Sequence, residues 1–187
     1  MKYSAIKNYD IANGTGVRVS LFVSGCNHHC KGCFNSEAWD FDHGEDYTID
    51  IRNNILRMLE PDYINGLSLL GGEPLDPLNV LEVYELVCEF RHKFKNSKDI
   101  WLYTGCTWEE LKGRLYKVKS ITDKDWSITN SVYYYLLSNI DILVDGRFIE
   151  EEKDISLVFR GSRNQRIIKC RETIKENKIE NPIILNL

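Results

Sequence analysis

The chain has 187 residues, of which 43% are apolar and 28% charged, and its net charge is −4 at pH 7. This length and composition suit a single globular domain over residues 1–187, and the slightly acidic balance gives no general attraction to nucleic acid or to an anionic membrane. No apolar run approaches the roughly 20 residues of a membrane-spanning helix, and the first residues lack the apolar stretch of a secretory signal. The sequence therefore predicts a cytoplasmic protein.

The first half of the chain predicts strands and helices in alternation. Residues 17–23 form an apolar run rich in β-branched side chains, which is typical of a strand. Apolar residues at helical spacing predict a helix over 49–59. Residues 67–70 predict a short buried strand, and a second helical pattern starts at 80–90 and continues toward residue 95.

The second half continues this alternation. A strand is predicted at 100–103, and Thr107 with Glu110 three residues later predicts a capping box at the start of a helix over 108–115. The remaining predicted elements are a helix at 132–137, a strand at 140–144, short apolar segments at 157–159, 167–168 and 183–185, and a polar helix near 172–178.

This order of elements predicts an α/β fold with a mostly parallel sheet. A complete eightfold barrel needs about 250 residues, whereas at roughly 30 residues per strand–helix unit this chain has room for about six units. The expected fold is therefore a partial, open (βα) barrel of about six strand–helix units. An open, doubly wound sheet is the alternative.

Unusual residue clusters follow four of the predicted strands. They are residues 24–35, Gly71-Gly72-Glu73-Pro74, Thr104-Gly105 and Asp145-Gly146. In parallel α/β folds, the loops at the carboxyl ends of the strands line the active site. The four clusters are therefore expected to meet on one face.

Three of the six cysteines, Cys26, Cys30 and Cys33, lie within eight residues. Because cytosolic thiols stay reduced, this spacing indicates a metal site rather than a disulfide framework. Three thiolates on so short a loop can bind three corners of a 4Fe-4S cluster and leave the fourth iron open, which is typical of a catalytic site. Cys106 is expected near this site, but the sequence supplies it no base.

The alternative is a zinc site made by the three cysteines with His28 or His29. Structural zinc sites usually take their ligands as two separated pairs, and this sequence has no second pair. Both histidines also lie between two of the cysteines, where they reach the same ion poorly. We therefore favour the cluster and interpret both histidines as solvated loop residues or as donors to cluster sulfur.

The Cys-x₃-Cys-x₂-Cys spacing after the first strand resembles the radical S-adenosylmethionine superfamily. The wider sequence around it resembles the activating proteins of anaerobic (class III) ribonucleotide reductases, and the match spans about residues 1–168. Residues 116–130 look like a variable insert without an assigned function. The motifs that carry the resemblance are Asp10-Ile11, Asn13-Gly14, Gly16, residues 22–26, His28, Cys30, residues 32–35, Trp39, Gly71-Gly72-Glu73-Pro74-Leu75, residues 144–148 and Arg160-Gly161-Ser162 with Asn164-Gln165.

The resemblance implies two cofactors, one 4Fe-4S cluster and S-adenosylmethionine. It implies that the Gly71–Pro74 segment binds the methionine amino group. Many superfamily members carry an aromatic residue that stacks on the adenine at the position of Gly32, and we expect Phe34, just after Cys33, to take that role here. From their placement after predicted strands, Thr104 and Asp145 are expected to contact the ribose or the substrate backbone, although both clusters also suit simple turns. The implied cofactor-binding residues are Gly32, Cys33, Phe34, Gly71, Gly72, Glu73, Thr104 and Asp145, beside the metal ligands Cys26, Cys30 and Cys33.

The implied function is that of a glycyl-radical-activating oxidoreductase. It cleaves S-adenosylmethionine reductively and takes a hydrogen atom from a glycine near the C-terminus of the large subunit of the reductase, with a low-potential electron donor such as a flavodoxin. The segment 161–165 is implied to lie near the active face, where it orders the partner's chain; a solvated loop is the simpler alternative. Two other functions stay open: activation of another glycyl radical enzyme such as pyruvate formate-lyase, and a zinc-binding interaction module without enzymatic activity.

Overall fold

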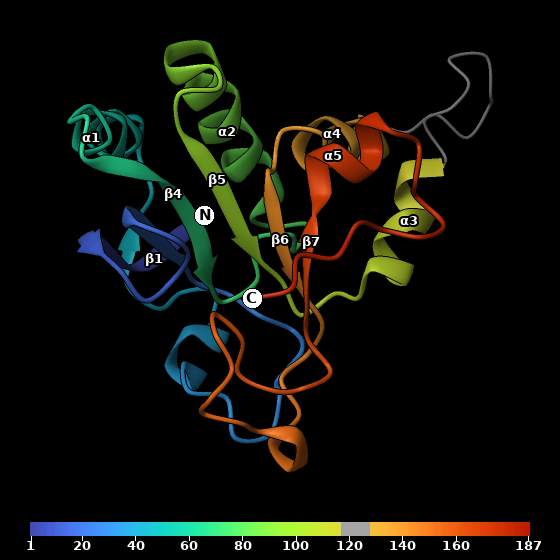
Figure 1. Cartoon of the computed structure of the whole chain (residues 1–187). Helices are drawn as coiled ribbons and strands as arrows, with labels where there is room; N and C mark the ends of the chain where they lie inside the picture. Colours follow the sequence, from blue (N-terminus) through green and yellow to red (C-terminus); the bar gives the residue numbers. More distant parts are fainter. Residues whose placement is uncertain (117–127) are drawn as a thin grey trace.

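The computed structural model describes residues 1–116 and 128–187, so most of the expected insert at 116–130 lies outside the described residues. One mixed sheet runs through the molecule in the order β3-β1-β2-β4-β5-β6-β7 (Figure 1). Its seven strands are β1 (Lys2–Asp10), β2 (Val17–Val23), β3 (Glu45–Asp46), β4 (Ile64–Gly71), β5 (Asp99–Tyr103), β6 (Ile142–Asp145) and β7 (Arg166–Lys169).

Four neighbouring strands, β2, β4, β5 and β6, run parallel, whereas β1, β3 and β7 pair antiparallel at the two sides. Helices make the crossovers between the parallel strands, as a parallel pairing requires. The helices are α1 (Ile49–Met58), α2 (Val80–Phe94), α3 (Trp108–Tyr116), α4 (Ile128–Leu137) and α5 (Cys170–Lys175), with short 3₁₀ helices at Ser36–Trp39 and Glu150–Glu152.

The expected count of about six strand–helix units is wrong. The described sheet has four parallel strands joined by three crossovers, because the chain before residue 17 and much of the chain after residue 145 enter antiparallel strands and irregular segments instead. The sheet is open, since β3 pairs only with β1 and β7 only with β6, so a barrel is not confirmed. The doubly wound alternative is not supported either: it requires a reversal of strand order, and these parallel strands are neighbours in their order along the chain.

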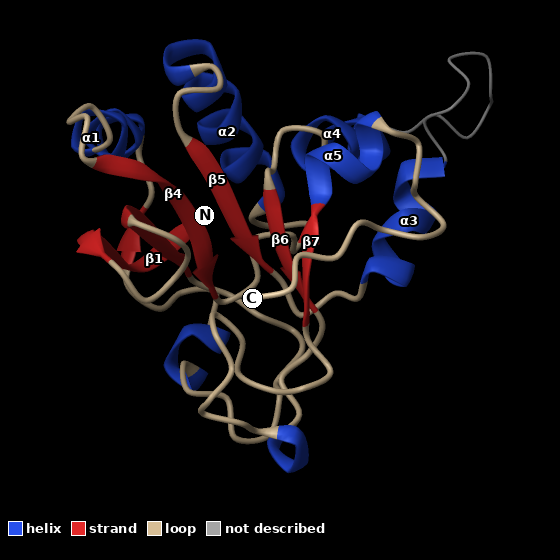
Figure 2. Ribbon diagram, in the orientation of Figure 1, coloured by secondary structure: helices blue, strands red, loops and turns tan. Residues whose placement is uncertain are grey.

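The two faces of the sheet have different partners, because side chains alternate across a strand. One face packs against the helices and forms the main apolar core (Figure 2). Its strand residues include Val19, Leu21, Leu67, Leu69, Ile100, Leu102, Leu143 and Ile168. The other face, here called the inner face, carries a smaller apolar cluster of Trp101, Val144 and Ile167, with Arg18, Ser20 and Ser68 buried on the same side.

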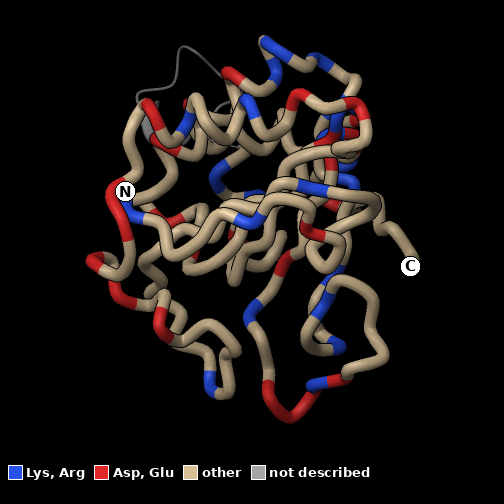
Figure 3. The backbone as a smooth tube through the Cα atoms, turned by 90° about the vertical axis from the view of Figure 1, so that its left-hand side faces the viewer, with Lys and Arg blue, Asp and Glu red and all other residues tan. Residues whose placement is uncertain are grey.

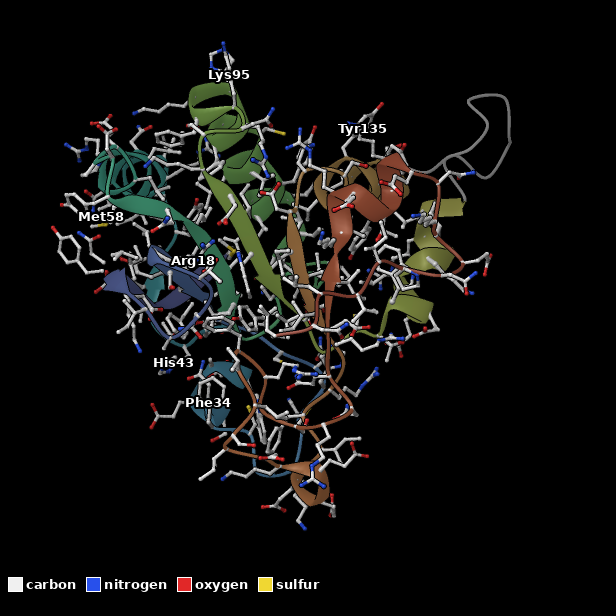
Figure 4. The ribbon with its side chains drawn as sticks, viewed as in Figure 1. Arg18, Phe34, His43, Met58, Lys95 and Tyr135 are labelled. Atoms are coloured by element: carbon white, nitrogen blue, oxygen red, sulfur yellow. The ribbon has the colours of Figure 1, made fainter. Side chains whose placement is uncertain are left out.

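Arg18 is a charged residue buried completely in the inner face (Figure 4). Its Nε donates to Ser68 Oγ over 2.7 Å, its Nη2 donates to the Leu67 carbonyl over 2.9 Å, and Asp99 lies 2.6 Å from the same nitrogen. The guanidinium also lies over the ring of Trp101, 5.5 Å from its centre. The charge is thus paired and hydrogen-bonded, as burial of a cation demands.

Most predicted elements are confirmed. The strand at 17–23 and the helices that begin at Ile49, Val80 and Trp108 are found where the sequence places them. The capping box is present, because Thr107 N donates to Glu110 Oε2 over 2.8 Å and Glu110 N donates to Thr107 Oγ1 over 3.3 Å. The segment 157–159 forms no strand, and the sequence missed β1, whose central residues are partly or fully exposed and therefore show no apolar pattern.

The carboxyl ends of the parallel strands all point to one side of the molecule. Figure 2 shows the long loops, with the two short 3₁₀ helices among them, gathered below the arrowheads of β4, β5 and β6 and away from α1 and α2. In the described part of the chain, acidic and basic residues are interspersed (Figure 3). Among the described helices, none has both the length and the apolar character needed to cross a bilayer.

Candidate functional site

A pocket of about 540 Å³ lies at the carboxyl ends of the parallel strands. Its wall combines the cysteine loop, the loops after β4, β5 and β6, and the irregular segment 148–165. The expectation that the four strand-end clusters meet on one face is therefore confirmed. Nine of the ten residues predicted for the site line this pocket: Cys26, Cys30, Gly32, Cys33, Phe34, Gly71, Gly72, Glu73 and Thr104.

The cysteine loop begins directly after β2 and is fixed by backbone hydrogen bonds. Gly25 N donates to the Ala38 carbonyl over 2.8 Å, and Cys26 N donates to the Trp39 carbonyl over 3.0 Å. On its other side, Glu73 N donates to the Gly25 carbonyl over 2.7 Å. The start of the loop is thus held between the 3₁₀ helix at 36–39 and the turn after β4.

The three cysteines of the loop are free thiols on the pocket wall. Cys26 is buried, whereas Cys30 and Cys33 are partly exposed. Burial raises the pKa of the Cys26 thiol to about 11, so this side chain becomes a thiolate readily only when a cation lies beside it. The chemistry of the donor set therefore suits a thiolate-ligated metal group.

The donor types on the pocket wall bear on the kind of metal group that it could hold. Cys26, Cys30 and Cys33 supply three thiols from one short loop, which is the donor set of a 4Fe-4S cluster with one iron left open. A second group of possible ligands in the described part of the chain is His28, Glu73 and Cys106, whose donor atoms all lie within 4.8 Å of one another.

Glu73 connects three of the loops around the pocket. Its Oε1 accepts from Leu75 N (2.9 Å) and Thr104 Oγ1 (2.8 Å), and its Oε2 accepts from Gly105 N (2.8 Å) and lies 2.9 Å from His28 Nε2. The side chain is almost fully buried. Because both carboxylate oxygens already have protein partners, Glu73 organises the pocket wall rather than offering a free oxygen to a ligand.

His28 differs from its interpretation as a solvated residue. Its side chain is only 15% exposed, and its Nε2 lies 3.9 Å from Cys106 Sγ as well as next to Glu73. The hydrogen bonds to Cys106 and to Glu73 raise the pKa of His28 to about 10. Cys106 therefore has a basic side chain next to it, which the sequence alone did not indicate.

Gly32 and Phe34 lie at the mouth of the pocket. The Phe34 side chain is 88% exposed and stands among the loops below the sheet (Figure 4). Gly32 has a φ of +72°, which disfavours other residues, and a Cβ there would come within 3.0 Å of Glu150. The backbone at Gly32 thus disfavours a larger side chain, and Phe34 is an exposed aromatic residue close to it in the chain.

Asp145 is the predicted site residue that does not line the pocket. Its buried carboxylate accepts from Trp108 N over 2.7 Å and from Arg166, whose Nη2 and Nε lie at 2.5 and 3.1 Å. Asp145 therefore ties the start of α3 and β7 to the end of β6. The sequence could not distinguish this role from ligand contact, because both require a polar residue at the end of a strand.

Replacement of Arg166 tests this role of Asp145. Arg166→Leu is expected to lower the free energy of unfolding by about 2–3 kcal/mol, because a buried carboxylate loses charged donors. Arg163→Leu is the matched control, since Arg163 is 71% exposed and pairs with Asp154 at the surface, where loss of an ion pair costs about 1 kcal/mol or less. Urea unfolding measures the change in the free energy of unfolding for each variant. Equal changes in Arg166→Leu and Arg163→Leu would contradict the structural role of Asp145.

The segment 161–165 folds back on the loop after β6. Asn164 Nδ2 donates to the Arg147 carbonyl over 2.8 Å, and Gln165 Nε2 donates to the Gly146 carbonyl over 2.9 Å. Gly161 and Gln165 both line the pocket. This segment is thus an ordered part of the wall, and its solvated-loop alternative is not supported.

Sequence reasoning missed two further parts of the wall, namely Tyr103 and the segment that contributes Lys153, Asp154, Ile155, Leu157 and Phe159. The hydroxyl of Tyr103 is buried and has no hydrogen-bond partner among the described residues, and burial raises its pKa. Tyr103 precedes the predicted Thr104 and faces the inner side of the sheet, so strand alternation is the signal that points to it.

Comparison with known proteins gives consistent results. A model of the 4Fe-4S single cluster domain family matches residues 12–168. The anaerobic ribonucleoside-triphosphate reductase-activating protein of Vibrio cholerae is 40% identical over 167 residues, which are 88% of this chain and 96% of that protein. The proteins of the same name from Escherichia coli K12 and Enterobacteria phage T4 are 37% and 35% identical over 167 residues each, covering 88% and 89% of this chain and 96% and 93% of theirs.

Proposed function

The chain belongs to the family of anaerobic ribonucleoside-triphosphate reductase-activating proteins with a 4Fe-4S single cluster domain, and from this we propose that it is a radical S-adenosylmethionine enzyme that activates such a reductase. The observation that carries the proposal is one pocket, lined by three free cysteines and by the loops after three parallel strands. The site of action is the cytoplasm, and a low-potential protein such as a flavodoxin is the proposed electron donor.

Cys26, Cys30 and Cys33 are the proposed ligands of the 4Fe-4S cluster. They suit it because all three are free thiols that line one pocket and lie on one short loop, without a second pair of ligands as structural zinc sites have. When bound, the cluster supplies the electron that splits S-adenosylmethionine into methionine and a 5′-deoxyadenosyl radical.

The residues of the chain bind and orient the cofactor. We assign the methionine part to the backbone at Gly71 and Gly72 and the adenine to Phe34, which is free at the mouth of the pocket. The Tyr103 hydroxyl is a donor without a partner in the described part of the chain, so a ligand acceptor in the pocket relieves the cost of its burial. Thr104 acts through Glu73, because its hydroxyl donates to that carboxylate.

The proposed substrate is a glycine in the large subunit of the reductase, from which one Cα hydrogen atom is removed. Glycine lacks a Cβ, so its Cα approaches a reacting atom closely. The pocket is open to such a chain, since Phe34 and Ile155 on its wall are 88% and 94% exposed. The role of the pocket is to hold the two reacting carbons together and to keep water away from the radical.

Two experiments in sequence test the proposal. Protein reconstituted with iron and sulfide without oxygen, then given a reductant and S-adenosylmethionine, is expected to produce 5′-deoxyadenosine. With the reductase added, electron paramagnetic resonance is expected to show a glycyl radical. Absence of 5′-deoxyadenosine would contradict the chemistry, and 5′-deoxyadenosine without a glycyl signal would contradict the partner and favour activation of another glycyl radical enzyme. Colourless protein with one zinc would support the non-enzymatic zinc module.

A further inference from the structure

His28 joins the cysteine loop to the rest of the pocket wall. It lies two residues after Cys26 and two before Cys30, and its Nε2 is 2.9 Å from Glu73 Oε2. Beside it, Asn27 Nδ2 donates to Asp76 over 2.8 Å, so the loop has a second side-chain bond to the same turn. Two neighbouring side chains thus connect the middle of the cysteine loop to the turn after β4.

The carboxylate that His28 contacts is itself immobilised. Glu73 also accepts from Leu75 N, Thr104 Oγ1 and Gly105 N, so it is bonded both to its own turn and to the loop after β5. An imidazole bonded to this carboxylate is therefore held by two strand-end loops. A flexible surface partner could not restrict the cysteine loop in this way.

A second, independent observation concerns the space that the ring occupies. A Cβ added at Gly105 would meet three atoms of the His28 ring at less than 3.0 Å, and these are the three nearest atoms. The φ of Gly105 is not in the left-handed region, so the backbone there does not itself demand glycine. Gly105 thus leaves room for the imidazole, and packing and hydrogen bonding agree on one position for it.

We propose that His28 is a positioning residue, whose imidazole, held between Glu73, Cys106 and Gly105, fixes the cysteine loop in the shape that retains the metal cluster. This inference rests on the proposed function, because it assumes the cluster on the loop. The donor atoms of His28, Glu73 and Cys106 also lie within 4.8 Å of one another, as in a metal site. Both oxygens of Glu73 already accept two hydrogen bonds each, however, so a hydrogen-bonded contact satisfies this group without a metal.

The test compares how fast reconstituted variants lose iron to a chelator without oxygen. His28→Ala is expected to lose iron at least tenfold faster than wild type, a size typical for the loss of a residue that orients a metal ligand. His28→Gln, which keeps a donor at a similar position, is expected to restore most of the retention. His92→Ala is the matched control, since His92 is exposed on α2, and is expected to behave as wild type.

A double-mutant cycle separates positioning from general damage. Gly105→Ala alone is expected to accelerate iron loss as much as His28→Ala, because the added Cβ displaces the ring. In the His28→Ala background, the same Gly105→Ala change is expected to add less than about twofold, since the ring is gone. Additive effects, or unchanged retention in His28→Ala, would overturn the proposal.

Two further measurements keep the outcomes apart. Urea unfolding of cluster-free His28→Ala is expected to show a loss of stability that His28→Gln largely restores, because the buried Glu73 carboxylate loses and then regains a donor. A loss that His28→Gln does not restore would indicate a merely structural role. Wild-type protein that takes up no iron would overturn the proposed function, and this inference with it. Zinc held by a variant that lacks Cys26, Cys30 and Cys33, and lost on Cys106→Ser, would replace the positioning role with a metal site.

Discussion

Cys30→Ala protein, reconstituted without oxygen, is expected to retain little iron and to form 5′-deoxyadenosine more than about 100-fold more slowly than wild type. Loss of a residue that only hydrogen-bonds a metal ligand typically lowers metal affinity or activity about 10–100-fold. Loss of the ligand itself is therefore expected to have a larger effect. The measurement is iron and labile sulfide per chain, followed by chromatographic assay of 5′-deoxyadenosine. The same result is expected for Cys26 and Cys33.

Cys88→Ala is the matched control for this prediction. Cys88 is an exposed thiol on α2, outside the pocket of the cysteine loop, so its loss is expected to leave iron content and product formation unchanged. The cluster-free Cys30→Ala protein should unfold within about 1 kcal/mol of wild type, because Cys30 is only partly buried. Full activity in Cys30→Ala, or equal losses in Cys30→Ala and Cys88→Ala, would remove the ligand assignment.

Gly72→Ala is expected to damage both the fold and the site. A Cβ at Gly72 would lie less than 3.0 Å from the carbonyl oxygens of Gly25 and Ala38, which are backbone atoms that cannot move aside. Such overpacking typically costs about 1–3 kcal/mol of stability. Because Gly25 directly precedes Cys26, the displaced backbone is expected to lower iron retention and 5′-deoxyadenosine formation at least tenfold.

The same substitution at Gly113 provides the comparison. No atom would lie within 4 Å of a Cβ at Gly113, and this residue is inside the helix α3. Alanine is therefore expected to raise the free energy of unfolding by about 0.5–1 kcal/mol through helix propensity, with activity unchanged. Urea unfolding of both variants checks the pair. Equal stability of Gly72→Ala and wild type would show that the two loops are not packed as described.

The sequence predicted best those parts of the molecule where local chemistry decides the structure. The strand at 17–23 is buried along nearly its whole length, and the capping box at Thr107 is a contact between residues three positions apart. Strand β1 was missed because it is held by pairing with β2 and β3 rather than by an apolar pattern. The number of parallel strands was overestimated for the same reason. The estimate divided the chain length by the length of a strand–helix unit, and that calculation cannot show which segments form antiparallel strands.

In the site, too, features set by a general rule of the fold were predicted, whereas those set by contacts between distant residues were not. The convergence of the cysteine loop with the loops after β4 and β5 follows from the rule for parallel sheets, and the pocket confirms it. The partners of individual side chains depend on contacts between distant segments. His28 meets Glu73 and Cys106 from 45 and 78 residues away, so no local pattern could distinguish it from a solvated histidine. Asp145 was likewise predicted to contact a ligand, but its carboxylate accepts hydrogen bonds from Arg166, which lies 21 residues later in the chain.

The buried guanidinium of Arg18 has a consequence for the direction from which ligands approach. Arg18 and Trp101 fill the inner face near the beginnings of β2 and β5, whereas Leu70, Tyr103 and Val144, nearer the ends of their strands, line the pocket. In the described part of the chain, the loops at the carboxyl ends of the strands are therefore the side that the pocket offers to a ligand. Under the proposed function, S-adenosylmethionine and the reductase chain share this side, so a bound reductase is expected to slow the exchange of S-adenosylmethionine.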